Sequence, residues 1–268
     1  MTSGNVRAMS LADDLALAHR MADIADSLSM ARFRAADLVV ETKPDLSPVS
    51  EADRAVELAL RELIAARRPD DSVLGEEYGN DGAADRQWIL DPIDGTKNYV
   101  RGVPVWATLI ALLDKGEITV GVVSSPPLAR RWWASAGNGA FVREPGSHQP
   151  RRLQVSAVRS LADASVSISD QVGWADRGAT AGLRVLLSDT WRQRGYGDFW
   201  SHMLVAEGAV DIAAEPHLES YDMAALVPIV QEAGGRITAF SGEPAVWGGC
   251  AVTTNGVLHD DVLNLLKE

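Results

Sequence analysis

Cysteine is almost absent from this sequence, since Cys250 is the one cysteine among 268 residues. No disulfide can therefore form within the chain, which fits a reducing compartment. Long apolar runs are also missing, and none approaches the roughly 20 residues that a transmembrane helix needs. The first residues lack a basic segment followed by an apolar stretch, so we expect no signal peptide and a cytoplasmic protein.

Basic residues are outnumbered by acidic ones. The chain has 25 Lys and Arg against 37 Asp and Glu, which gives a formal net charge of -12. Such a chain is a poor general binder of nucleic acids or anionic membranes, so we expect neither as a partner. The same charge would repel a phosphate ester, unless some carboxylates hold divalent cations that become the dominant local charges.

Several familiar catalytic signatures are missing as well. The sequence contains no Gly-x-Ser-x-Gly elbow, no Walker phosphate loop, no Cys-x-x-Cys pair and no His-Glu-x-x-His motif. Phosphatases that form an aspartyl-phosphate need two aspartates separated by one residue, whereas Asp91 and Asp94 are separated by two. These absences argue against the corresponding classes of hydrolase, NTPase and phosphatase.

Hydrophobic periodicity predicts an α+β first half. Residues 11–30 and 50–67 carry apolar side chains at helical spacing. Hairpin turns are expected at Lys115-Gly116 and Asn138-Gly139. Strand-like runs are expected at residues 73–74, 88–90, 106–112, 119–123 and 131–133. We therefore expect residues 1–150 to form helices and an antiparallel sheet.

The pattern changes near residue 150, and strands alternate with helices from there on. Gly234-Gly235 would close one of these helices, and Pro228 should kink it because proline removes a backbone hydrogen bond. The expected strands are 166–168, 211–213, 237–239 and 251–253, and the expected helices are 178–187, 198–207, 222–233 and 260–267. Residues 151–268 are therefore expected to form an α/β half.

The most informative segment is Trp-Ile-Leu-Asp-Pro-Ile-Asp-Gly-Thr at residues 88–96. An apolar strand leads directly to Asp91 and Asp94, and Pro92 should end the strand pairing because it has no N–H. The two carboxylates can therefore converge on one point, together with the free carbonyl of Ile93. Such oxygen ligands suit hard divalent cations.

Other residues would complete such a site. If Gly95 and Thr96 open a helical turn, their N–H groups offer an anion site beside the metals. Further carboxylates occur at Glu76, after another apolar strand, and at Asp53 and Asp222, near helix starts. Each also has a plain structural role open to it, as a helix cap or part of a turn. The four acidic segments together favour a metal site over separate caps.

These motifs resemble those of the inositol monophosphatase family. They are Gly-Glu-Glu at 75–77, Trp-Ile-Leu-Asp-Pro-Ile-Asp-Gly-Thr-Lys-Asn-Tyr at 88–99, Tyr-Asp-Met-Ala-Ala at 221–225, Glu-Ala-Gly-Gly at 232–235 and Pro-Val-Ser-Glu-Ala-Asp at 48–53. The resemblance covers nearly the whole chain. Within the family, the chain is most similar to the actinobacterial histidinol-phosphate phosphatase branch, on the segments 94–102, 131–134 and 196–199.

The resemblance implies a layered α-β-α-β-α fold, up to three Mg²⁺ ions per subunit and usually a homodimer. Residues 1–150 would carry most of the metal ligands, and residues 151–268 would supply Asp222 and the substrate pocket. The reaction would be hydrolysis of a phosphomonoester by direct attack of a metal-activated water. The implied metal ligands are Glu76, Asp91, the Ile93 carbonyl, Asp94 and Asp222. The implied catalytic residues are Asp53, Thr96 and Glu76, with the amides of Gly95 and Thr96 holding the phosphate.

Their positions in the family pattern imply that Asp198 and Glu215 face the leaving group of the substrate. Two carboxylates there would suit the cationic amine or imidazolium of histidinol phosphate, and less strictly the hydroxyls of an inositol. Arg192 and Arg194 either line this pocket or form a surface pair. The segment at 169–174 departs from the family pattern and is expected near the pocket.

Three hypotheses about function follow, and the first two have a small phosphorylated metabolite as the substrate. The first is a histidinol-phosphate phosphatase of histidine biosynthesis. The second is a phosphatase for inositol 1-phosphate or another cyclitol, sugar or nucleoside monophosphate, including one in specialised metabolism. The third is a binding or regulatory protein without catalysis, which the loss of a ligand carboxylate would favour. No such carboxylate is lost here.

Overall fold

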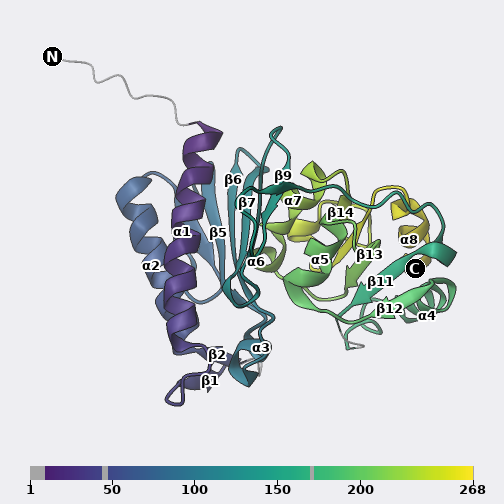
Figure 1. Ribbon diagram of the computed structural model, residues 1–268, viewed down its shortest axis with the longest axis horizontal. Helices are drawn as coiled ribbons and strands as arrows, with labels where there is room; N and C mark the ends of the chain where they lie inside the picture. Colours follow the sequence, from purple (N-terminus) through teal and green to yellow (C-terminus); the bar gives the residue numbers. More distant parts are fainter. Residues whose placement is uncertain (1–9, 44–47, 170–171, 268) are drawn as a thin grey trace.

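Alternating layers of helix and sheet build the fold of the computed structural model, which describes residues 10–43, 48–169 and 172–267 (Figure 1). Residues 1–9, on which the expectation about a signal peptide rests, lie outside these ranges. The order of the layers is α1 (Leu11–Arg32) and α2 (Glu51–Arg67), an eight-stranded sheet, then α5 (Asp198–Ala206), α6 (Ser220–Met223) and α7 (Leu226–Glu232), a five-stranded sheet, and α4 (Thr180–Asp189) with α8 (His259–Leu266). The predicted α-β-α-β-α arrangement is confirmed.

Both helices of the first layer begin at serine caps. Ser10 and Ser50 are the N-caps, and each exchanges hydrogen bonds with an aspartate three residues later, Asp13 or Asp53, in a capping box. The buried faces of the two helices pack on one side of the eight-stranded sheet, in an apolar cluster that includes Trp88. Across the described ranges, no helix is both long and apolar enough to cross a membrane.

The eight-stranded sheet has the order β10-β9-β8-β7-β6-β5-β3-β4. Its strands are β3 (Ser72–Gly75), β4 (Gly79–Asn80), β5 (Arg86–Asp94), β6 (Ala107–Asp114), β7 (Glu117–Ser125), β8 (Arg130–Ser135), β9 (Ala140–Arg143) and β10 (Arg151–Arg152). The prediction of an antiparallel sheet is wrong at one pair, because β3 and β5 run parallel with Gly75 opposite Leu90. Glu76, directly after β3, and Asp91, directly after Leu90 within β5, therefore lie side by side at the same edge of the sheet.

A separate pair of short strands precedes α2. Strands β1 (Val40–Thr42) and β2 (Pro48–Ser50) pair antiparallel. Residues 44–47, which connect the two strands, lie outside the described ranges. The pairing places Ser50, the N-cap of α2, opposite Val40, and the N–H of Glu51 donates to the Val39 carbonyl.

The five-stranded sheet has the order β12-β11-β13-β15-β14. Its strands are β11 (Ser165–Ile168), β12 (Arg192–Arg194), β13 (Ile212–Glu215), β14 (Arg236–Thr238) and β15 (Ala251–Thr254). Strand β11 runs parallel to both β12 and β13, whereas β15 runs antiparallel to β13 and β14. Strand β12 was not predicted, because its three residues are polar and lack an apolar run. The predicted division of the chain near residue 150 falls beside β10, the last strand of the other sheet.

The helix predicted over residues 222–233 is wrong as one element, because α6 ends at Met223 and α7 begins at Leu226. Pro228 explains the break, since a proline ring clashes with the carbonyl four residues earlier in a continuous helix. In α7 it lies in the first turn, where its missing N–H removes no helical hydrogen bond. A Cβ on Gly121 in β7 would lie 2.3 Å from the Ala225 carbonyl, so glycine lets this layer approach the sheet closely.

Candidate active site

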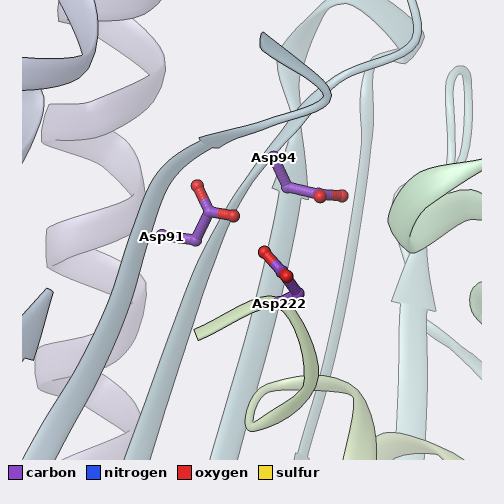
Figure 2. Close-up of side chains that lie close together, drawn as sticks. All are labelled: Asp91, Asp94 and Asp222. Carbon is purple, nitrogen blue, oxygen red and sulfur yellow. The ribbon is translucent and has the colours of Figure 1, made fainter. Parts of the chain in front are cut away.

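Three aspartates converge where the eight-stranded sheet meets the middle helical layer. Asp91 and Asp94 lie at the end of β5, and Asp222 lies in α6 (Figure 2). One carboxylate oxygen from each lies within 4.8 Å of the others. Asp91 is 1% exposed and Asp94 is 8% exposed, so two of the three carboxylates are buried. Figure 2 shows Asp222 pointing from α6 towards the two aspartates on β5.

A β-bulge explains how Asp91 and Asp94 reach the same side of the sheet. Residues three apart in a regular strand point to opposite faces, because side chains alternate. Asp91 lies opposite Leu109 and Asp94 lies opposite Ala107, so three steps on β5 match two steps on β6. The extra residue reverses the alternation. The prediction that Pro92 ends the pairing is therefore wrong, because the ladder shifts register there and resumes at Asp94.

The residues after the bulge form a tight turn into a short helix, α3 (Thr96–Arg101). Gly95 has a φ of 83°, a left-handed conformation that favours glycine. The Ile93 carbonyl, a predicted metal ligand, accepts a hydrogen bond of 3.0 Å from Thr96 Oγ1. Its side chain is buried against Tyr99 and Trp106, which anchors the turn. The sequence pattern therefore forms the turn that was expected of Gly95 and Thr96.

Asp53 and Thr96, the predicted catalytic pair, face each other from two elements. Asp53 Oδ2 accepts hydrogen bonds from the N–H of Ser50 at 2.9 Å and from its hydroxyl at 2.5 Å. Asp53 Oδ1 lies 3.5 Å from Thr96 Oγ1. Burial raises the pKa of Asp53 to about 6, although the hydrogen bonds from Ser50 oppose this shift. The capping role and the site position predicted for Asp53 are therefore both present in one side chain.

Glu76 lies beside the cluster but its carboxylate is held by a lysine. Lys43 Nζ lies 2.7 Å from Glu76 Oε1 and 2.6 Å from Glu77 Oε1. Glu76 is still close enough to the aspartates for its charge to raise the pKa values of Asp91 and Asp222. The sequence reasoning did not single out Lys43, because its position relative to Glu76 depends on how the strands before α2 fold back.

A second residue that sequence reasoning missed lies beneath the loop that carries Glu76. The buried carboxylate of Glu57, in α2, accepts hydrogen bonds from the N–H of Glu77 at 2.7 Å and the N–H of Tyr78 at 3.2 Å. Arg61 Nε donates to it at 2.8 Å from the next helical turn. A Cβ on Gly75 would lie 2.0 Å from Glu57 Oε1, so glycine is required there.

Burial and mutual repulsion disfavour the charged forms of all three aspartates. Burial, followed by the charges of Glu76 and Asp94, raises the pKa of Asp91 well above its usual range. Burial, followed by the charges of Asp198 and Asp222, does the same for Asp94. Burial also raises the pKa of Asp222 to about 7, against the hydrogen bond it accepts from a backbone N–H.

The unpaired oxygen of Asp91 tests whether these residues fit a metal ion. Asp91 Oδ1 is buried and makes no hydrogen bond to any described residue. A buried carboxylate oxygen without a partner is costly, and a cation removes that cost. Several carboxylate oxygens with a nearby carbonyl form a donor set that suits Mg²⁺. The cluster therefore fits a divalent cation of that kind.

A pocket of about 320 Å³ lies beside the cluster. Its lining combines two of the aspartates with Lys97 and with residues from the second half of the chain: Asp94, Lys97, Ser169, Val172, Asp198, Glu215, Pro216, His217, Leu218 and Asp222. Asp198 and Glu215, predicted to face the leaving group, both line it. Ser169 and Val172 come from the segment expected near the pocket, of which residues 170–171 lie outside the described ranges.

Arg192 and Arg194 lie elsewhere. Together with Trp191 and Gln193 they line a separate surface hollow along β12. Arg194 is exposed and its guanidinium donates to the Gln193 carbonyl. Of the two alternatives left open by the sequence, a pocket lining and a surface pair, this position corresponds to the surface pair.

Asp198 has an unusual backbone conformation and lies next to the aspartate cluster. It is the first residue of α5, after the N-cap Gly197, and its φ is 51°. The N-cap of α5 is therefore Gly197 and not Asp198. Its Oδ2 accepts a hydrogen bond of 3.1 Å from Asn98 Nδ2, and the next N–H, that of Phe199, donates to Asp94 Oδ2 at 2.7 Å.

Comparison with known proteins agrees with this arrangement. A model of the inositol monophosphatase family matches residues 11–268. A histidinol-phosphatase from Mycobacterium tuberculosis is 56% identical over 256 residues, covering 95% of this chain and 98% of that protein. One from Streptomyces coelicolor is 52% identical over 260 residues, covering 96% and 97%. An IMPase structure from Thermotoga maritima has a TM-score of 0.83 at 31% identity, covering 95% of this chain and 96% of its own. The chain therefore belongs to the inositol monophosphatase family, as its motifs predicted.

Proposed function

We propose that this chain is a Mg²⁺-dependent phosphomonoesterase that hydrolyses histidinol phosphate to histidinol and phosphate. The observation that carries the proposal is one pocket in which Asp94 and Asp222 of the buried acidic cluster share a wall with Asp198 and Glu215. Two relatives that are 56% and 52% identical carry the name histidinol-phosphatase, which supports the choice of substrate.

The acidic cluster would hold the metal. Asp91, Asp94, Asp222 and the Ile93 carbonyl are the proposed ligands, and Glu76 would join them by exchanging the ammonium of Lys43 for a cation. Up to three Mg²⁺ ions per subunit would supply positive charge for the phosphate and make a nearby water more acidic.

The residues of the chain would position the phosphate and receive the proton. Thr96 Oγ1, placed between the Ile93 carbonyl and Asp53 Oδ1, orients the attacking water. Asp53 accepts the proton of that water through the Thr96 hydroxyl, a role suited to a pKa of about 6. The N–H groups of Gly95 and Thr96 hold the phosphate, and no phosphoenzyme is formed.

The leaving group would bind between the two remaining carboxylates. Asp198 and Glu215 lie on the pocket wall contributed by the second half of the chain. The amine and imidazole of histidinol can both carry positive charge, so each carboxylate gains a charge-assisted hydrogen bond. An inositol offers hydroxyl groups alone, which form weaker hydrogen bonds to carboxylates.

A substrate panel tests the proposal. We would measure kcat/KM with Mg²⁺ on L-histidinol phosphate, inositol 1-phosphate and a nucleoside monophosphate. We expect histidinol phosphate to lead by at least about tenfold, the value of one charge-assisted hydrogen bond. Expression should also rescue a histidine auxotroph that lacks histidinol-phosphatase. A rate on histidinol phosphate no better than on inositol 1-phosphate would favour the alternative of a cyclitol phosphatase.

Assembly and location are also proposals here. The family resemblance leads us to propose a homodimer that acts in the cytoplasm on a small phosphorylated metabolite. Light scattering of the purified protein would give the oligomeric state, and a single protomer mass would contradict the dimer.

A further inference from the structure

A buried histidine lies directly behind the pocket and takes no part in the chemistry described so far. His202, in α5, is 0% exposed. Its Nδ1 lies 2.7 Å from Thr253 Oγ1, and its Nε2 lies 3.3 Å from Glu215 Oε1. A polar side chain at this depth must be accounted for, because burying an imidazole without partners is costly.

The register of the five-stranded sheet explains why these groups meet. Thr253 in β15 lies opposite Ala213 in β13. Side chains alternate along a strand, so Glu215, two residues after Ala213, points to the same face as Thr253. Helix α5 packs against both strands. His202 therefore contacts one group from each strand, and Glu215 also reaches the pocket at the strand end.

The contacts of the imidazole favour one of its two neutral tautomers. His202 Nε2 and Glu215 Oε1 are both buried, and in the described part of the chain neither makes a hydrogen bond with standard geometry. If the ring proton were on Nδ1, the lone pair of Nε2 would face the lone pairs of a carboxylate. If Thr253 donates to Nδ1, the proton is on Nε2 and faces Glu215. The second arrangement places a donor opposite an acceptor at both contacts.

We propose that His202 is a positioning residue for Glu215 and thereby sets the preference for a cationic leaving group. The Nε2–H donates to Oε1 and leaves the second carboxylate oxygen for the pocket. Thr253 sets the tautomer that makes this donation possible. The inference rests on the proposed function, because it assumes that Glu215 contacts the leaving group.

Two substitutions of His202 separate this role from packing. The amide of His202→Asn reaches the place of Nδ1 and keeps the contact with Thr253, whereas the amide of His202→Gln reaches the place of Nε2 and keeps the donor to Glu215. We expect His202→Asn to raise KM for L-histidinol phosphate about tenfold, because it removes a hydrogen bond to a charged group. His202→Gln should restore most of that loss.

The second substrate is p-nitrophenyl phosphate, whose leaving group carries no cation. The ratio of kcat/KM for histidinol phosphate to kcat/KM for p-nitrophenyl phosphate should fall in His202→Asn and recover in His202→Gln. Thr253→Val should also lower this ratio. Because this variant retains His202, it tests the proposal even if His202→Asn fails to fold. Equal losses on both substrates, or equal effects of Asn and Gln, would overturn the proposal.

A double-mutant cycle tests the path of the effect. If His202 acts through Glu215, His202→Asn should change the ratio by less than about twofold in a Glu215→Gln background, since the carboxylate it positions is gone. Full additivity would overturn the proposal. Wild-type kinetics separate the two failures: a wild type without preference for histidinol phosphate defeats the proposed function and this inference with it. A preference that survives His202→Asn and Thr253→Val defeats this inference alone.

Discussion

The backbone N–H of Phe199 donates a hydrogen bond of 2.7 Å to Asp94 Oδ2. It joins the first turn of α5 to the end of β5, and so fixes which way the Asp94 carboxylate faces. The hydrogen bond favours the charged form, but burial and the charges of Asp198 and Asp222 raise the pKa of Asp94 more strongly. The carboxylate is therefore held in place in a setting where a bound cation would stabilise its charged form.

Asp94→Asn should separate the charge of this residue from its shape. The amide oxygen can still accept the N–H of Phe199, so the fold should survive. Loss of a proposed metal ligand should lower kcat by at least ~100-fold. This is more than the loss of activity expected when a residue that only supports a ligand is removed. Steady-state kinetics in Mg²⁺ and thermal melting in EDTA would check this. Asp70→Asn, at an exposed aspartate outside the pocket, is the control, and an active Asp94→Asn enzyme would contradict the metal assignment.

Glu57→Gln should weaken activation of the enzyme by Mg²⁺, although Glu57 is not a proposed metal ligand. The carboxylate accepts from the N–H groups of Glu77 and Tyr78 and from Arg61, and an amide can supply one acceptor oxygen where two are used. The loop that carries Glu76 should loosen, so the half-activating Mg²⁺ concentration should rise about tenfold.

Titration of activity with Mg²⁺ would measure this change in Glu57→Gln. The matched control is Glu62→Gln, at an exposed position of the same helix. A variant of Glu57 that melts at a lower temperature but keeps the wild-type Mg²⁺ dependence would show that Glu57 supports the fold alone.

Some local features of this structure could be predicted from the sequence. The cap at Ser50, the turn at Gly95 and the helix break at Pro228 each follow from one residue and its neighbours, although the break at Pro228 is sharper than the kink we expected. The bulge between Asp91 and Asp94 was not readable, because a register shift depends on the partner strand. Proline in a strand predicts an end to pairing, and here the pairing resumes beyond it.

Residues that act across elements escaped the sequence for a different reason. Lys43, Glu57 and His202 each contact a predicted site residue or its loop from more than 12 residues away. No periodicity or spacing encodes such distances, which are set by strand order and by the parallel pairing of β3 with β5. The signal that could have pointed to Glu57 was its spacing, because an acidic residue four positions after Asp53 lies on the same helical face.

The left-handed backbone of Asp198 should lower the free energy of unfolding of variants that carry a residue other than glycine there. Its φ of 51° is left-handed, a conformation that costs an alanine roughly 1–2 kcal/mol and glycine very little. Asp198→Ala and Asp198→Gly both lose the carboxylate, so that loss cancels when the two are compared. The free energy of unfolding should be higher for Asp198→Gly by about 1 kcal/mol.

Urea unfolding of the Asp198 variants would measure this difference, and kinetics would show its functional side. Both variants should raise KM for histidinol phosphate, because both remove a carboxylate from the pocket. An alanine variant as stable as the glycine variant would mean that the chain relaxes its backbone at this position when the carboxylate is absent.

The stability gained from Mg²⁺ should grow as pH rises from 5 to 8. The pKa of Asp222 is raised from 3.8 to about 7 in the folded protein, and those of Asp91 and Asp94 are raised as well. Between pH 4 and pH 7 the folded protein therefore keeps protons that the unfolded chain has lost. The contribution of these three aspartates to folding stability in EDTA therefore falls as pH rises through this window, because in the unfolded state they bind fewer protons there.

Magnesium reverses this trend, because it binds the deprotonated cluster and not the protonated one. A ligand present at 100 times its Kd adds about 2.7 kcal/mol to the free energy of unfolding. The difference in melting temperature between Mg²⁺ and EDTA should therefore be small at pH 5 and large at pH 8. In Asp94→Asn the difference should be small at both pH values, since a proposed ligand is missing. A difference in the wild type that is as large at pH 5 as at pH 8 would mean that Mg²⁺ stabilises the protein somewhere other than this cluster.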